Sequence, residues 1–243
     1  MKGVILTIAS EARIVDISHQ LRSYSIEQGA FFLEQAANRF PEGTVHVVVV
    51  DPGVGSKRRG LAASAGGRYF VGPDNGVLSR ALQAGKPQVQ AVDEERYALK
   101  PTSRTFHGRD VFAPAAAWLA KGTPLSQIGP KADEYVRLPS LEPERTERGW
   151  RGRILNIDRF GNIVTNLPPE RLAEGARLIV GDLEVTHASE TYEAAATREP
   201  FAIVGSSGYL EISIRQDSAA AHARVEIGDQ VELERPAGSK AGR

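Results

Sequence analysis

The chain has no cysteine among its 243 residues. It therefore has no disulfide, no thiolate nucleophile and no zinc site built on cysteine, and its redox compartment cannot be read from cysteine usage. It also lacks a surplus of either charge, because 30 basic and 30 acidic side chains cancel. A balanced chain has no electrostatic footprint for nucleic acid or for an anionic membrane, so we expect neither as a partner.

Long apolar runs are missing as well. No stretch approaches the roughly 20 apolar residues that are needed to cross a bilayer. The opening residues 1–9 are a marginal match to a signal peptide, but Glu11 and Arg13 follow them closely. The sequence therefore predicts a cytoplasmic protein that is not bound to a membrane. Its length is sufficient for one large or two small domains.

The first part of the chain, residues 1–136, alternates strand-like runs with helical patterns. This alternation predicts an α/β sandwich with a largely parallel sheet. We expect strands at residues 14–17 and 45–50, and helices at residues 25–39, 75–84 and 111–120.

A different pattern begins after residues 137–149, which are polar, contain proline and are typical of a linker. In residues 150–236, short apolar runs are separated by glycine, asparagine or aspartate, and this pattern predicts a small all-β barrel domain. The strand candidates are residues 153–157, 163–167, 177–180, 183–186, 201–204, 209–214 and 230–233. We expect residues 237–243 to be a disordered tail.

The most informative stretch is residues 46–58 (HVVVVDPGVGSKR). Four consecutive valines suit a strand that is buried on both faces. The strand ends at Asp51, where open α/β sheets bind their ligands. Arg58 lies close enough in the chain to fold back toward this acid. The competing interpretation is a surface turn in which Asp-Pro-Gly only reverses the chain.

A second cluster lies in residues 105–114 (TFHGRDVFAP), where His107, Arg109 and Asp110 precede an apolar, helix-like stretch. A histidine in a glycine-flanked loop can titrate near neutral pH or hold a water molecule. A lone histidine is more often structural, but Asp51 and Arg58 favour a functional interpretation of His107.

Six segments together carry a family resemblance. They are residues 14–19 (IVDISH), 48–55 (VVVDPGVG), 72–76 (GPDNG), 105–110 (TFHGRD), 156–166 (NIDRFGNIVTN) and 206–211 (SSGYLE). With these segments in family order, the chain resembles the S-adenosylmethionine (SAM) hydroxide adenosyltransferases. These enzymes are adenosyl-forming SAM hydrolases and are related to the fluorinating and chlorinating enzymes. Each segment alone is a weak signal, whereas six in order are specific.

The resemblance implies a reaction and a catalytic triad. The reaction is SAM plus water giving adenosine and L-methionine, with no metal and no second cofactor. The family's Asp–Arg–His triad maps onto Asp51, Arg58 and His107. Arg58 is expected to stabilise the nascent hydroxide, while Asp51 and His107 position the water and pass on its proton. The alternative is that the three side chains form a structural ion-pair network.

The substrate contacts are carried over in the same way. Asp158 matches an acid that faces the methionine amino group, Asn162 an amide that reads adenine, and Ser206 a methionine-binding serine. Tyr24 occupies the position of an aromatic residue that packs against the substrate, and Phe106 in the TFHGRD segment is a further substrate-binding candidate. Ser207 replaces an arginine of the halogenating enzymes, and a serine lacks the positive charge with which that arginine would bind a carboxylate. For Phe160 and Tyr209, packing in a hairpin core is favoured at least as much as a substrate contact. Asp74 and Asn75 could simply form a turn and cap a helix.

Two departures from the family matter. The halogenating enzymes have tyrosine where this chain has Asp51 and a halide-binding serine where it has Gly108, so hydrolysis is favoured over halogenation. Family members also begin with a strand and a Thr-Asp-Phe-Gly segment about twenty residues upstream, and its aspartate holds the ribose hydroxyls. The N-terminus therefore looks truncated: either the start codon is assigned too far downstream, or a strand is lost. We expect a gap in the first sheet.

The function predicted from the sequence is SAM hydrolysis. A SAM- or adenosine-binding protein without turnover and a SAM-dependent halogenating synthase are the alternatives. Because family members are typically trimers, we also expect a homotrimer. Its sites would lie between the first domain of one subunit and the barrel of the next.

Overall fold

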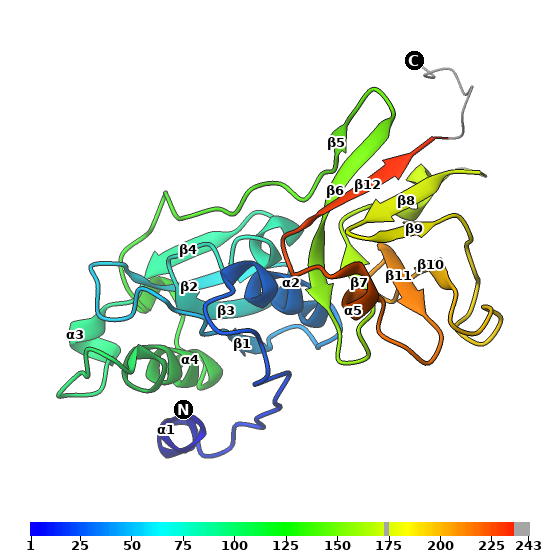
Figure 1. The fold of residues 1–243 in the computed structure, drawn as a ribbon. Coiled ribbons are helices and arrows are strands. Elements are labelled where there is room, and N and C mark those ends of the chain that lie inside the picture. The colour runs from blue at the N-terminus through cyan, green and yellow to red at the C-terminus, as the bar shows by residue number, and fades with distance from the viewer. Residues whose placement is uncertain (173–174, 236–243) are drawn as a thin grey trace. The chain divides into compact units, whose positions relative to one another are not determined.

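A computed structural model describes residues 1–172 and 175–235. The chain divides into two compact units, Met1–Pro139 and Ser140–Arg243, and each is described by itself (Figure 1). The first unit combines helices with a sheet and the second is almost entirely β-structure, so the predicted fold class is confirmed. The expected tail at residues 237–243 lies outside the described residues.

Two of the three helices predicted for the first unit are present, at residues 25–39 and 111–120. Its helical elements are α1 (Lys2–Ile8), α2 (Ile26–Ala37), α3 (Glu94–Tyr97) and α4 (Ala113–Ala120), with 3-10 turns η1 (Ala81–Ala84) and η3 (Leu125–Gln127) and the π-helical turn η2 (Gly108–Phe112). The Ser25 side chain caps α2 by accepting from the backbone N–H of Gln28. The helix predicted at residues 75–84 is wrong except for η1. Gly76 has a φ of +97°, which turns the chain away from a helical path.

The first sheet contains β1 (Val45–Val47), β2 (Gly60–Ala65), β3 (Arg68–Pro73) and β4 (Gln88–Ala91), in the order β1-β3-β2-β4 (Figure 1). Only β1 and β3 are parallel; β2 pairs antiparallel with both β3 and β4. The sheet is therefore mixed, and the expectation of a largely parallel sheet is wrong. The reason is a tight hairpin between β2 and β3, in which Gly66 and Gly67 both have positive φ.

The two strands predicted near the start of the first unit also differ from the structure. The strand expected at residues 45–50 is paired as a strand only over β1. No strand forms at residues 14–17, where Val15 is 55% exposed and Ile17 is 47% exposed. Among the described residues, β1 pairs with β3 alone. The edge of β1 that faces away from β3 is thus open in this part of the chain.

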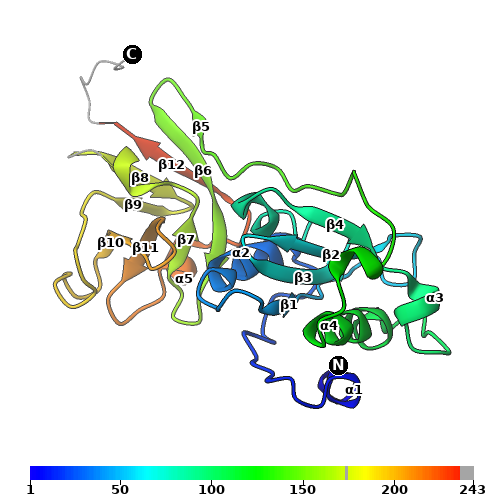
Figure 2. The same cartoon turned by 180° about the vertical axis from the view of Figure 1, so that it is seen from behind.

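The core of the first unit lies on both faces of the sheet. Leu61 and Ala63 of β2 pack with Leu33 of α2, whereas Ala62, between them, packs with Ala115 of α4. Because successive side chains of a strand point to opposite faces, β2 is buried along nearly its whole length. The helix α1 lies beside α4 and has no buried residue (Figure 2).

The second unit is a curled antiparallel sheet. Its strands are β5 (Glu144–Arg145), β6 (Gly149–Ile157), β7 (Ile163–Thr165), β8 (Arg177–Val180), β9 (Leu183–Val185), β10 (Pro200–Val204), β11 (Leu210–Ile214) and β12 (Gln230–Glu234), with the turn η4 (Pro169–Arg171) and the helix α5 (Ala219–Ala223). The order is β10-β11-β7-β6-β12-β8-β9, and β5 pairs with β6. A bridge between Ala188 and Ala202 brings the chain after β9 to β10, which makes the sheet barrel-like.

All seven strands predicted for this unit are present. Their inward side chains, among them Ile154, Ile163, Leu210 and Ile212, form one buried cluster. The predicted linker at residues 137–149 is wrong in part, because β5 and the first residue of β6 lie within it. Backbone pairing of β5 with β6 gives this polar stretch a regular structure that its composition does not indicate.

Candidate active site

Asp51, Arg58 and His107 are in direct contact. Arg58 Nε lies 3.0 Å from Asp51 Oδ1, and Arg58 Nη2 donates to the other carboxylate oxygen. The same Nη2 lies 2.8 Å from His107 Nδ1. A guanidinium can only donate, so Nδ1 accepts and the neutral ring carries its proton on Nε2. The side chains of Arg58 and Asp51 are only 9% and 5% exposed. The structure thus brings the predicted triad together, while its catalytic role stays a prediction.

Two contacts with the backbone position these side chains. The amide of Asn75 donates to the Val50 carbonyl over 2.8 Å, which fixes the chain just before Asp51. Gly55 has a φ of +78°, and a Cβ added there would lie 2.3 Å from the carbonyl oxygen of Arg104. A residue without a side chain therefore lets the loop that carries Arg58 approach the segment that carries His107. Asn75 thus anchors the site. Its Oδ1 also accepts from the backbone N–H of Val77 over 3.1 Å, so the predicted turn is present, although no α-helix follows it directly.

The neighbours of His107 have a structural role. Arg109 Nε and Nη2 bond to the two oxygens of Asp110 over 2.6 and 3.0 Å, and the backbone N–H of Ser103 donates to Asp110 over 2.8 Å. The Arg109 guanidinium holds the pKa of the buried Asp110 carboxyl below its ordinary value, helped by the Ser103 N–H. Asp110 therefore ties the loop in front of His107 to the start of η2.

Two predicted substrate contacts of the first unit are exposed. Tyr24 is 78% exposed and has a φ of +68°, just before the Ser25 cap of α2. Phe106 is 47% exposed, and the guanidinium of Arg109 lies 5.0 Å from the centre of its ring. Both rings can therefore meet a ligand from outside the unit.

Asp158 and Asn162 lie together in the second unit, in the hairpin between β6 and β7. One oxygen of Asp158 accepts from the backbone N–H groups of Phe160 and Asn162 over 2.8 and 3.0 Å, and the other accepts from the Asn162 amide over 2.9 Å. Both side chains line a cavity of about 760 Å³. Ser206 is exposed in the turn between β10 and β11 and does not line this cavity.

The same cavity changes the interpretation of Phe160. Its side chain is 65% exposed and lines the cavity, so packing in the hairpin core is wrong for this residue. Tyr209 is half-buried.

Tyr192 is a further cavity residue that the sequence did not single out, and its hydroxyl bonds to Glu211 over 2.9 Å. Glu211 ends the SSGYLE segment, so a motif marked its position, whereas no motif marks Tyr192.

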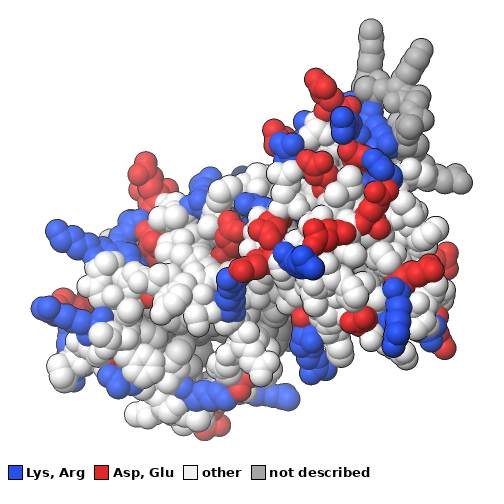
Figure 3. Space-filling view, viewed as in Figure 1, with Lys and Arg blue, Asp and Glu red and all other residues white. Residues whose placement is uncertain are grey.

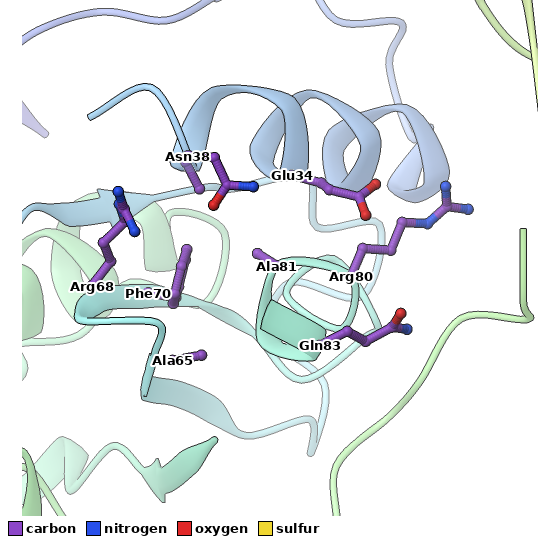
Figure 4. Close-up of a pocket in the computed structure, with 9 residues that line it drawn as sticks. Glu34, Asn38, Ala65, Arg68, Phe70, Arg80, Ala81 and Gln83 are labelled. Carbon is purple, nitrogen blue, oxygen red and sulfur yellow. The ribbon is translucent and has the colours of Figure 1, made fainter. Parts of the chain in front are cut away.

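A separate, smaller cavity of about 230 Å³ lies between α2, β3 and η1 (Figure 4). Glu34 and Arg80 lie toward one end, Arg68, Phe70 and Asn38 lie toward the other, and Ala81 lies between the two groups. Burial raises the pKa of Glu34, and the charge of Arg80 partly offsets this effect. The residues predicted for the active site do not line this cavity.

Neither the charges on the face in Figure 3 nor the candidate metal ligands of the described residues indicate a further site. Basic and acidic side chains are interspersed on the face in Figure 3. In residues 1–172 and 175–235, no cluster of three or more histidine, aspartate or glutamate side chains could hold a metal ion. No helix within this described part of the chain is long and apolar enough to span a membrane.

Comparison with known proteins matches this architecture. Residues 1–129 match the SAM hydroxide adenosyltransferase N-terminal domain, and residues 152–232 match the C-terminal domain of the same family. A structure of an uncharacterized conserved protein from Thermotoga maritima superposes with a TM-score of 0.88 at 31% identity, covering 96% of this chain and 93% of that one.

Relatives with named activities support the same family. An (R)-S-adenosyl-L-methionine hydrolase from Thermus thermophilus is 37% identical, covering 96% of this chain and 92% of its own length. One from Salinispora arenicola is 35% identical, covering 95% and 90%. A fluorinase from Actinopolyspora mzabensis is 25% identical. The family match and the fold thus define an adenosyl-transferring class of enzyme. The chain belongs to the SAM hydroxide adenosyltransferase family, and the resemblance seen in six sequence segments is confirmed.

Proposed function

We propose that this enzyme hydrolyses SAM at the ribose 5′ carbon to give adenosine and L-methionine. The contact of Asp51, Arg58 and His107, in a chain of this family, is the observation that carries the proposal. The methionine part of SAM is already a good leaving group, because its sulfur is a positively charged sulfonium in SAM and leaves as a neutral thioether. The remaining needs are an in-line water molecule, a rigid substrate and a group that takes the water's proton.

The bond changes balance without a further reactant. The water oxygen forms a bond to the 5′ carbon, the bond from that carbon to sulfur breaks, and sulfur keeps the electron pair. The surplus proton of the water passes to the protein. The positive charge of Arg58 stabilises the developing hydroxide. The proposed reaction therefore uses no metal and no second cofactor, and dialysis against a chelator should leave the rate unchanged.

We assign the first proton transfer to Asp51. While Arg58 donates to His107 Nδ1 and the ring proton sits on Nε2, neither ring nitrogen is ready for a second proton. Each Asp51 oxygen accepts one N–H from Arg58 and retains another lone pair. His107 Nε2 then serves as a donor that orients the water oxygen.

The substrate contacts in this proposal come from the second unit and from two exposed rings. Asp158 faces the methionine ammonium as a charge-assisted acceptor, and Asn162 reads the adenine edge. The Asn162 Nδ2 donates to Asp158, which leaves the amide oxygen to accept from an exocyclic amine. Ser206 contacts the methionine moiety, while Tyr24 and Phe106 pack against the substrate. The shared cavity of Asp158 and Asn162 supports this assignment.

The decisive experiment is chromatography of (R)-SAM after incubation with the purified protein, in buffers with and without chloride. We expect adenosine and methionine in equal amounts in both buffers. Formation of 5′-chloroadenosine would instead identify a halogenating synthase. Calorimetry that shows adenosine binding, with no methionine released from SAM, would identify a binding protein without turnover.

A homotrimer in the cytoplasm completes the proposal. The predicted site residues are divided between the two units, and this division supports sites that join Asp51, Arg58 and His107 of one subunit to Asp158, Asn162 and Ser206 of another. Light scattering should give the mass of three chains. Co-expression of inactive Asp51→Asn and Asp158→Ala chains should restore about a quarter of the sites, because each restored site takes one intact half from each variant. No recovery would contradict shared sites.

A further inference from the structure

Tyr192 lines the cavity shared by Asp158 and Asn162 and forms a hydrogen bond with Glu211, which does not itself line the cavity. The Tyr192 hydroxyl donates to Glu211 Oε2 over 2.9 Å. The Tyr192 ring lines the cavity and is 46% exposed, whereas Glu211 on β11 is 7% exposed. Burial, followed by the bond to Glu211, raises the pKa of Tyr192 to about 12. The hydroxyl therefore stays protonated and remains a donor at neutral pH.

The orientation of the Tyr192 ring depends on side-chain contacts. Tyr192 lies in the irregular segment between β9 and β10, where no strand pairing holds it. Its ring meets Phe201 of β10 edge-on, with ring centres 6.1 Å apart and an interplanar angle of 76°. Phe201 thus contacts the ring and Glu211 holds the hydroxyl, so loss of the bond to Glu211 removes one of these two orienting contacts.

Glu211 also supports the turn that carries Ser206. A Cβ added at Gly205 would lie 1.7 Å from Glu211 Oε1, so the carboxyl group packs directly on the Gly205 backbone. The Gly205 N–H donates to the Tyr209 carbonyl over 2.9 Å, which closes this turn. One buried carboxyl therefore connects the cavity wall at Tyr192 with the backbone just before Ser206.

We propose that Glu211 is a positioning residue for substrate binding, which holds the Tyr192 ring and the Ser206 turn in their binding geometry. This inference rests on the proposed function, because it takes the cavity of Asp158 and Asn162 as part of the substrate site. Glu211 acts through Tyr192 and Gly205, so it should affect affinity rather than the chemical step. A merely structural Glu211 would affect thermal stability and leave the affinity of the folded protein unchanged.

The test measures KM and kcat for SAM, and the Kd of SAM and adenosine by calorimetry, on folded variants. Tyr192→Phe removes one hydrogen bond, so KM and the adenosine Kd should rise about 2–10-fold with kcat unchanged. Glu211→Ala should raise both about tenfold or more, since it removes both contacts. Glu211→Gln keeps an oxygen acceptor of the same shape and should restore most of the affinity.

A matched control and a double variant sharpen the result. Glu190 is an exposed carboxylate near Tyr192 in the chain, and Glu190→Ala should leave all constants unchanged. Tyr192→Phe combined with Glu211→Ala should cost little more than Glu211→Ala alone, because the two residues share one bond. Additive effects would contradict the pairing.

The outcomes separate the two proposals. Variants that alter adenosine affinity in a protein without SAM turnover would support the positioning role and overturn hydrolysis. A hydrolase whose folded Glu211→Ala variant keeps its wild-type KM and Kd would overturn the positioning role alone. A protein that binds neither SAM nor adenosine would overturn both.

Discussion

Arg58 holds both carboxylate oxygens of Asp51 through two nitrogens of one guanidinium. Bidentate pairing of this kind fixes the geometry of both groups, which is the requirement for a group that must meet a water molecule in line with a breaking bond. The guanidinium carbon of Arg58 lies over the Phe112 ring, 5.1 Å from its centre, so the ring packs against the guanidinium. A surface turn, the alternative for residues 46–58, would leave these side chains in solvent, whereas they are almost fully buried.

Asp51→Asn should reduce the rate of adenosine formation by at least about 100-fold, because an amide cannot take the water's proton. The Kd for SAM should change much less, since Asp51 faces the water. His107→Ala should also lose at least about 100-fold. His107→Gln should retain more activity than Asp51→Asn, because the amide still accepts from Arg58 and still donates. Single-turnover kinetics and calorimetry give the two quantities. Asp133→Asn, at an exposed carboxylate paired with Lys131, is the matched control. Full activity of Asp51→Asn would exclude the proposed proton acceptor.

Arg58→Lys should lower kcat by at least about tenfold while the protein stays folded and charged. A single ammonium cannot reach both oxygens of Asp51 and Nδ1 of His107 at once, so the triad loses its fixed geometry. The measurement is kcat together with the thermal midpoint, and Arg59→Lys is the neighbouring control, because Arg59 pairs with Asp74 instead. Equal losses in the two variants would mean that position 58 has no special role.

Asp110 should make the stability of the first unit fall in acid. Its folded-state pKa is lowered, chiefly by Arg109, so its stabilising contribution is present above the pKa of the unfolded state. That contribution is lost as pH falls through the lower, folded-state pKa, in a window below about pH 4. Asp110→Asn should destabilise the protein by about 1–3 kcal/mol at pH 7 and show a weaker loss in acid than the wild type. Urea unfolding from pH 7 to pH 3 gives both quantities. Identical pH profiles would contradict the role of this carboxylate.

The local signals that predicted the fold were those that tertiary contacts do not override. Ser25 followed by apolar residues at helical spacing predicted α2, and glycine-separated apolar runs predicted all the strands of the second unit. The β2–β3 hairpin was missed, although the adjacent Gly66 and Gly67 are a known hairpin signal. The β-branched residues at 14–17 predicted a strand that needs a partner, and no described segment pairs with it.

The candidate site was predictable where motifs marked it and unpredictable where distant residues complete it. Asp51 and Arg58 are close in the chain, so a turn could bring them together. Their contact with His107 depends on the approach of Gly55 to Arg104, which no spacing rule reveals. Likewise, the bond between Tyr192 and Glu211 joins an irregular segment to a strand, 19 residues apart.

The last prediction tests the close approach of Gly55 to Arg104 by substituting two glycines of the same loop. Gly55→Ala places a Cβ 2.3 Å from a backbone oxygen at a φ of +78°, so the loop must move away from Arg104. We expect a loss of about 1–3 kcal/mol in stability from the strained conformation and an accompanying fall in kcat, because Arg58 is displaced from His107. At Gly53 the nearest atom to an added Cβ, Ser56 Oγ, is 3.4 Å away, and φ is not positive. Gly53→Ala should therefore stay within about 1 kcal/mol of the wild type and keep its activity. Urea unfolding and kcat for both variants give the comparison. If the two alanines behave alike, the close approach at Gly55 is not what brings Arg58 to His107.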